Sequence, residues 1–243
     1  MADADSILIG CNPIPVFRAS AAYDLHDHET VREENEDYAK LMKLGWRLDY
    51  VERQPKYAVE YPEKLAMAVF VKGDMAVIAL KGTTPSAASD LHLDLASIVG
   101  GVPPCGPLEE AAVEVKKYQG QKKRVMVTGH SLGGYMAEVV ATNLQIGGVG
   151  FCAPGSGWHG GKKHSGFQNI NFKHDPMGNI LAGIYEHPQW SVYVEDAGKP
   201  IHSMAYMVKC MENPGRTGWT NQNVVSRCES NWNGYHTKCN TPK

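Results

Sequence analysis

Along the middle of the chain, apolar residues switch between the spacing of strands and the spacing of helices. Two β-prone runs, Leu65–Val71 and Met75–Leu80, are separated by Lys72-Gly73-Asp74, which is typical of a hairpin turn. Helices and strands are then expected in alternation, at Leu108–Tyr118, Val125–Val127, Leu132–Gln145, Val149–Cys152, 168–173, 190–194 and 203–211. This alternation predicts an α/β fold with a mostly parallel central sheet and helices on both faces.

The N-terminal part of the chain carries a weaker pattern. Residues 1–27 indicate no clear element, whereas Thr30–Leu44 has helical periodicity and Gly45 is a natural helix stop. Neither an internal repeat nor a low-complexity linker interrupts the sequence. We therefore expect one domain over residues 1–243, ending in a loop-rich, cysteine-containing tail at 210–243.

Residues 84–107 form a long connection between a predicted strand and a predicted helix. Its leucines alternate as in a strand, but Leu91, Leu95 and Ile98 fit a helix equally well. A Gly-Gly pair and a Pro-Pro pair near its end break either pattern. Long, partly apolar connections bounded by Gly and Pro are often mobile lids, so this segment is a candidate lid.

Composition narrows the functional classes. The 243 residues carry a formal net charge of -2, whereas nucleic-acid binding usually shows a basic excess or patch. The strongest basic run, Lys122-Lys123-Arg124, fits a solvated turn before a strand. We therefore expect no nucleic-acid partner. No apolar stretch reaches membrane-spanning length.

The cysteines leave two interpretations open. Six are present and none forms a CxxC pair, so neither a zinc site nor a redox pair is indicated. Three of them, Cys210, Cys228 and Cys239, lie in the weakly patterned tail. Disulfides are reasonable for such a tail in an oxidising compartment, and reduced, buried cysteines are the alternative. We expect at least one disulfide joining two of these three.

The segment Thr128-Gly129-His130-Ser131-Leu132-Gly133-Gly134 ends a predicted strand and opens a predicted helix. It contains Gly-x-Ser-x-Gly, the pattern of a nucleophile elbow, in which the glycines give neighbouring backbone room to approach the serine. The N–H of Leu132, at the helix start, can face a developing oxyanion. Ser131 is therefore the predicted nucleophile, and an incidental serine in a Gly-rich turn is the alternative. We expect the His130 side chain to point away from the reacting face.

In the form Gly-His-Ser-Leu-Gly-Gly, this segment resembles the class 3 (fungal-type) lipase family of the α/β-hydrolase superfamily. Upstream, Ile78-Ala79-Leu80-Lys81-Gly82-Thr83 is similar to that family's strand ending in a basic residue, Gly, and Ser or Thr. The resemblance implies that Thr83 completes an oxyanion hole and that the long segment after it carries a lid. It covers roughly residues 65 to 210 and implies an α/β-hydrolase fold.

In that fold the nucleophile is followed in the chain by an acid and then a histidine. The later candidates are Asp175, Glu186, Glu195 and Asp196 for the acid, and His187, His202 and His236 for the base. Asp175 follows a strand-like run, and the segment around it resembles the family's acid segment. His202 precedes an apolar helical run and resembles the family's histidine segment. We predict Asp175 and His202.

These residues predict a serine ester hydrolase that works through an acyl-enzyme. The resemblance and the lid-like segment imply lipid carboxylic esters, acylglycerol or phospholipid, as substrates. Ser131 attacks, His202 moves the proton, Asp175 orients His202, and Thr83 with the Leu132 N–H binds the oxyanion. Such a mechanism requires no metal and no organic cofactor. The expected partners are an ester substrate and, transiently, a membrane or lipid surface, and the chain is expected to act as a monomer.

Other functions remain open on the same residues. They include a secreted bacterial toxin of the phospholipase type, a thioesterase, peptidase or acyltransferase, and a lipid-binding protein without turnover. The first ten residues lack the positive region of a secretory signal. Secretion or delivery to a periplasm is nevertheless favoured, either as a trimmed form or by a route that reads no N-terminal signal.

Overall fold

A computed structural model describes the protein over residues 14–22, 34–52, 66–82, 105–156, 166–172, 174–178, 190–194, 202–212, 224–230 and 236–240. The helices are α1 (Ile14–Ala21), α2 (Glu36–Lys43), α4 (Cys105–Gly120), α5 (Leu132–Leu144) and α6 (Met204–Glu212). The strands are β1 (Arg47–Glu52), β2 (Met67–Lys72), β3 (Met75–Leu80), β4 (Arg124–His130), β5 (Gly147–Phe151), β6 (Phe167–Phe172), β7 (Trp190–Val194), β8 (Val224–Ser230) and β9 (His236–Asn240).

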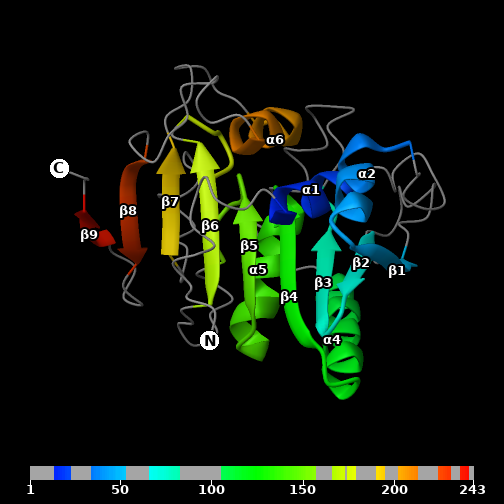
Figure 1. The fold of residues 1–243 in the computed structure, drawn as a ribbon. Coiled ribbons are helices and arrows are strands. Elements are labelled where there is room, and N and C mark those ends of the chain that lie inside the picture. The colour runs from blue at the N-terminus through cyan, green and yellow to red at the C-terminus, as the bar shows by residue number, and fades with distance from the viewer. Residues whose placement is uncertain are drawn as a thin grey trace, which may run out of the picture.

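The strands form one sheet in which spatial order follows chain order, from β1 to β9. The central strands β3 to β7 are parallel, whereas β1, β2, β8 and β9 extend the two edges in antiparallel pairing. Parallel neighbours require a crossover connection, and α4 and α5 supply it on either side of β4. The carboxyl ends of the central strands therefore meet at one edge of the sheet, the upper edge in Figure 1.

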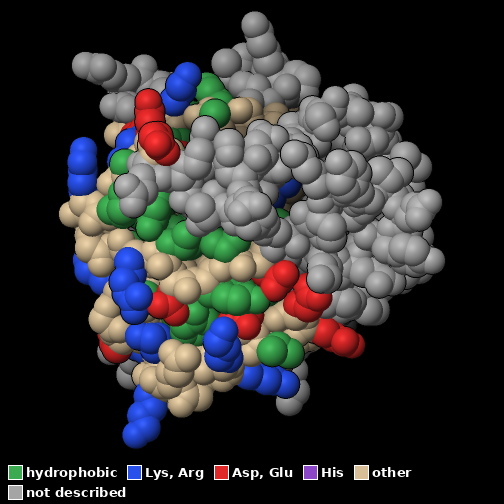
Figure 2. Space-filling model, turned by 90° about the vertical axis from the view of Figure 1, so that its right-hand side faces the viewer, with side chains coloured by type: hydrophobic (Ala, Val, Ile, Leu, Met, Phe, Trp, Pro, Cys, Tyr) green, Lys and Arg blue, Asp and Glu red, His purple; other side chains and the backbone are tan. Residues whose placement is uncertain are grey.

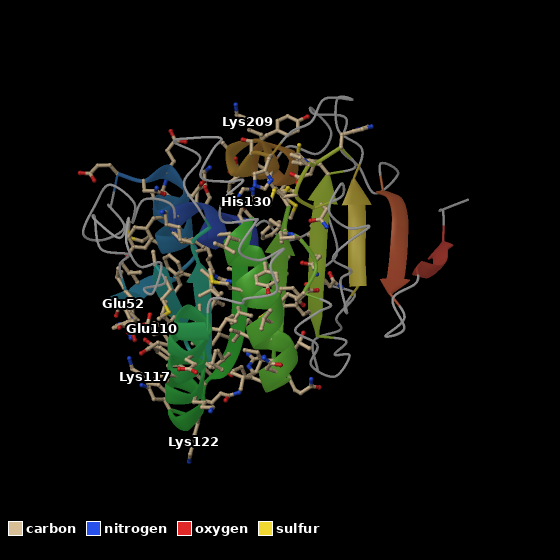
Figure 3. The ribbon with its side chains drawn as sticks, turned by 180° about the vertical axis from the view of Figure 1, so that it is seen from behind. Glu52, Glu110, Lys117, Lys122, His130 and Lys209 are labelled. Carbon is tan, nitrogen blue, oxygen red and sulfur yellow. The ribbon has the colours of Figure 1, made fainter. Side chains whose placement is uncertain are left out.

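Helices cover both faces of the sheet. Figures 1 and 3 show α4 and α5 on one face, with α1 and α2 on the other and α6 near the upper edge. Each face has its own apolar core. One core joins α4 and α5 to β2, β3 and β4, and the other joins α1, α2 and α6 to the opposite side of the strands. Because both sides are covered, β2 and β3 are buried almost throughout, as their continuous apolar sequence requires.

Charged side chains of both signs are exposed among the described residues. On the face in Figure 2, acidic and basic side chains are interspersed among small hydrophobic areas. Among the described residues, the exposed ion pairs include that of Arg124 with Asp74. No helix in the described part of the chain is long and apolar enough to cross a membrane.

The predicted fold class, an α/β fold with parallel central strands and helices on both faces, is confirmed. Three local predictions differ from the structure. Helix α1 and strand β1 lie where no element was predicted, and α4 begins at Cys105, inside the candidate lid segment. The tail, expected to be loop-rich, contains β8 and β9. The rest of the candidate lid, residues 84–104, lies outside the described residues.

Candidate active site

Ser131 occupies the turn between β4 and α5, at the carboxyl edge of the sheet. Its backbone has φ 58° and ψ -128°, a conformation that costs a non-glycine residue on the order of 1–3 kcal/mol. Two backbone hydrogen bonds hold it there. The Ser131 N–H donates to the Phe151 carbonyl at 3.0 Å, and the Ser131 carbonyl accepts from Tyr135 at 3.1 Å. The sharp turn raises the serine above the end of its strand, as the elbow pattern predicts.

Glycines near this serine permit close backbone packing. A Cβ on Gly133 would collide with the Leu80 carbonyl oxygen, and one on Gly129 would collide with the backbone of Gly133. The first turn of α5 can therefore lie directly against the ends of β3 and β4. Replacing either glycine would push the helix start away from the sheet edge.

Asp175 lies on the turn that follows β6 and is fully buried. Its Oδ1 accepts hydrogen bonds from the N–H groups of Met177, at 2.8 Å, and Gly178, at 2.6 Å. Asn171 secures the same turn, because its Nδ2 donates to the Gly178 carbonyl at 3.2 Å. These bonds fix the carboxylate and leave Oδ2 directed away from its own loop.

His202 lies two residues before the start of α6 and joins the other two side chains. Its Nδ1 lies 2.9 Å from Asp175 Oδ2, and its Nε2 lies 2.8 Å from Ser131 Oγ. A carboxylate can only accept, so Nδ1 carries the proton and Nε2 accepts from the serine hydroxyl. The histidine side chain is 12% exposed, which leaves it reachable from solvent, whereas Asp175 is not.

The structure thus brings Ser131, Asp175 and His202 together in a hydrogen-bonded chain. The competing acids, Glu186, Glu195 and Asp196, and the competing His187 lie outside the described residues. His236 belongs to β9, at the far edge of the sheet from β4.

The two predicted oxyanion donors can be followed only in part. Leu132 is the first residue of α5, where a backbone N–H has no partner within the helix. Thr83 lies outside the described residues, but the chain just before it is placed. The N atom of Gly82 lies close enough to Gly133 that a Cβ there would be 2.8 Å from it. The segment Lys81-Gly82, which leads to Thr83, therefore lies against Gly133, the second residue after Ser131.

The expectation for His130 was wrong. Its ring lies against the ring of His202, with centroids 4.7 Å apart and planes tilted by 31°. Burial, with His202 as a further cause, lowers the pKa of His130 well below 6.5. His130 is the last residue of β4 and lies at the carboxyl edge of the sheet, where the fold also brings His202. Nothing in the sequence indicates that His202 packs against His130.

A second residue that the sequence interpretation missed is Cys152, the residue after β5. It is fully buried with a positive φ of 47°. Burial, followed by the nearby Asp175 carboxylate, raises the pKa of its thiol well above 9.0. Cys152 is therefore a protonated thiol beside the acid, and it cannot act as a thiolate nucleophile at neutral pH.

Behind the site, a buried polar network ties α5 to the sheet. Glu138 is fully buried in α5 and accepts from Asn169 Nδ2 at 2.6 Å and from the Ser156 N–H at 3.0 Å. Asn169 belongs to β6 and Ser156 to the segment after β5. A charged or polar group so deeply buried requires such partners. The network holds the helix that begins at the nucleophile against the strand that leads to the acid.

Two solved lipase structures are similar in fold to this chain. The nonglycosylated LIP2 lipase of Yarrowia lipolytica is similar over 74% of this chain and 77% of its own, with 13% identity and a TM-score of 0.51. Lipase II from Rhizopus niveus is similar over 88% of this chain and 91% of its own, with 12% identity and a TM-score of 0.46. No family model matches the chain, and no curated protein does.

At identities this low, structural similarity speaks for the fold and not for the reaction. Three observations indicate the same fold. They are the parallel central strands, the elbow between β4 and α5, and the similarity to the Yarrowia lipolytica lipase. The chain has an α/β-hydrolase fold.

Proposed function

We propose that this protein is a carboxylic ester hydrolase in which Ser131 is the nucleophile, His202 the general base and acid, and Asp175 the residue that orients His202. The observation that carries the proposal is the continuous hydrogen-bonded chain from Asp175 Oδ2 through both nitrogens of His202 to Ser131 Oγ. A serine hydroxyl is a weak nucleophile at neutral pH, and a histidine held at this distance can remove its proton.

The reaction begins when Ser131 Oγ attacks the ester carbonyl carbon and its proton moves to His202 Nε2. The resulting imidazolium donates from Nδ1 to the buried Asp175 carboxylate, which stabilises its charge. The carbonyl oxygen becomes an oxyanion, for which we assign the Leu132 N–H and Thr83 as donors. Collapse releases the alcohol, protonated by His202. Water, activated by His202, then cleaves the acyl-enzyme and restores Ser131.

For the substrate we propose lipid esters, either acylglycerols or phospholipids. The support is the resemblance of the elbow and of the Lys81-Gly82-Thr83 segment to fungal-type lipases, together with structural neighbours that are named lipases. Contact with a lipid surface is part of this proposal.

The test is a panel of substrates offered to the full chain. It contains a triglyceride emulsion, phosphatidylcholine vesicles, p-nitrophenyl butyrate and an acyl thioester, each with the wild-type protein and the Ser131→Ala variant. We expect release of fatty acid from one of the lipid substrates. Loss of triad function leaves only binding and oxyanion catalysis, so Ser131→Ala should be slower by about a thousandfold or more.

The panel also separates the alternatives. Hydrolysis of the thioester alone would indicate a thioesterase, and acyl transfer to an added alcohol without hydrolysis would indicate an acyltransferase. Binding to vesicles with no turnover of any substrate would indicate a lipid-binding protein and would contradict the proposed function.

A further inference from the structure

The face of the proposed general base is covered by a second histidine. The centroids of His130 and His202 lie 4.7 Å apart, a separation typical of attractive ring pairs, and the rings are tilted by only 31°. The two residues come from different elements, since His130 ends β4 and His202 precedes α6. Figure 3 shows His130 at the end of β4, close to α6.

His130 is itself held firmly. It is 4% exposed, and it pairs with Phe151 in the parallel register of β4 and β5. The next residue, Ser131, donates its N–H to the Phe151 carbonyl. Pairing of β4 with β5 therefore fixes the backbone of both His130 and Ser131.

The contacts of His202 fall into two groups. Ser131 and Asp175 hydrogen-bond to its two nitrogens and so lie near the plane of its ring. His130 instead lies against the face of the ring. Rotation about the Cβ–Cγ bond would break both hydrogen bonds, and a ring packed on the face opposes that rotation. The two groups of contacts together leave the imidazole one orientation.

Charge favours this arrangement. The pKa of His130 lies well below 6.5 because burial disfavours its charged form, with His202 as a second cause. At neutral pH it is therefore a neutral imidazole, and it stays neutral when His202 takes a proton. The imidazolium of the catalytic cycle then forms against an uncharged ring and not against a second cation.

We infer that His130 is a positioning residue, which packs on the face of His202 and keeps its nitrogens directed at Ser131 and Asp175. The inference rests on the proposed function, because it assigns a role within the proposed triad. According to this inference, the ring of His130 is required and its nitrogens are not. A ring without nitrogens should serve, and a polar side chain without a ring should not.

The experiment compares His130→Phe with His130→Asn on p-nitrophenyl butyrate, with active sites counted by a fluorophosphonate. His130→Phe should keep kcat within a fewfold of wild type. His130→Asn should lose kcat by about 10- to 100-fold with KM nearly unchanged, because the base is misplaced and substrate binding is not. Phe70→Leu is the matched control, since it removes a fully buried ring on β2, distant from the site. It should lower the melting temperature and leave kcat per active site unchanged.

Two results overturn the inference. One is a kcat per active site equal to wild type in His130→Asn, and the other is an active His130→Asn beside an inactive, folded His130→Phe. Should His130→Phe not fold, wild type against His130→Asn still decides. If wild type hydrolyses no ester, the proposed function fails, and nitrogen-15 NMR of His202 tests the packing by itself. A single Nδ1–H tautomer in wild type that becomes exchange-broadened in His130→Asn supports it, and identical spectra contradict it.

Discussion

Hydrogen bonds hold both oxygens of the Asp175 carboxylate. Oδ1 accepts two backbone N–H groups from its own turn, and Oδ2 faces the Nδ1 of His202. Because a carboxylate can only accept, it selects the histidine tautomer whose other nitrogen can take a proton from serine. One oxygen thus anchors the residue, and the other determines the chemistry of its neighbour.

This division predicts the effect of Asp175→Asn. The amide keeps the size of the side chain but can present an N–H to His202, which favours the wrong tautomer. The kcat should fall by about ten-thousandfold, the order of loss known for this change in a serine triad. The control is Asp74→Asn, which removes an exposed partner of Arg124 at the opposite end of β3. Esterase kinetics with unfolding curves check both variants, and an active Asp175→Asn would exclude Asp175 as the orienting acid.

At the scale of elements, the site depends on how closely α5 approaches β3. The hypothetical Cβ of Gly133 meets the Leu80 carbonyl oxygen, which is backbone and cannot turn aside. Gly120, at the end of α4, has open space at the same position. Both are helical glycines, so replacement by alanine changes helix propensity similarly in each and changes packing only at Gly133.

Gly133→Ala should therefore destabilise the protein by about 1–3 kcal/mol, the usual cost of overpacking. It should also lower kcat by tenfold or more, because the shift moves the Leu132 N–H relative to Ser131. Gly120→Ala should be neutral or slightly stabilising, with full activity. Urea unfolding and ester kinetics on both variants give the comparison. Equal behaviour of the two would show that the approach of α5 to β3 is not needed.

The C-terminal hairpin sharpens the expectation for the cysteines. The register of β8 and β9 places Cys228 directly opposite Cys239, whereas Cys210 is buried in α6. Opposed residues of antiparallel strands have Cα atoms about 4.5 to 5.5 Å apart, within the range of disulfides. We therefore expect Cys228 and Cys239 to be joined when the protein is isolated under oxidising conditions.

Peptide mapping without reduction should recover these two cysteines as one linked pair. Because the loop between them is short, reduction should lower stability by no more than about 3 kcal/mol. The double variant Cys228→Ser with Cys239→Ser should match the reduced protein. Full alkylation of both cysteines in the native, unreduced chain would contradict the prediction.

For the molecule as a whole, the sequence predicted the elements with strong periodicity. The hairpin of β2 and β3, the strands β4 to β7 and the helices α5 and α6 lie close to the predicted ranges. Helix α1 was missed because its eight residues, which begin Ile-Pro-Val, hold too few turns to show a period. Strand β1 was missed because its exposed and half-buried residues alternate weakly. The β8–β9 hairpin was missed because its strands are polar and gain their order from pairing.

The site, like the fold, could be predicted from the sequence only where the constraints are local. The elbow could be predicted because the constraint is local, with glycines on both sides of a strained serine. Asp175 and His202 could be proposed from chain order and adjoining elements. The packing of His130 on His202 could not, because it joins residues from β4 and α6 that only the fold brings together. The buried bond between Glu138 and Asn169 escaped prediction for the same reason.

The candidate lid, residues 84–107, enters the account at this scale. Because it joins β3, beside the elbow, to α4, we expect it to pass near Ser131. We expect its apolar residues to cover the site in water and to face acyl chains at a lipid surface, since exposing them to water is unfavourable. Activity should rise when a substrate passes from monomers to aggregates. Leu95→Ser with Ile98→Ser should blunt that rise and spare small soluble esters. A rate unchanged across the aggregation threshold would indicate a site that is always open.

The central claim is that Ser131 is a nucleophile activated by His202, and covalent labelling tests it most directly. The wild-type chain, Ser131→Ala and His202→Ala are each incubated with a fluorophosphonate and examined by intact-mass and peptide mass spectrometry. We predict a single adduct on Ser131 in wild type, none in Ser131→Ala, and labelling slowed by about a thousandfold or more in His202→Ala, which removes the base. A folded wild-type chain that stays unlabelled, or one that carries its adduct on another residue, would contradict the account.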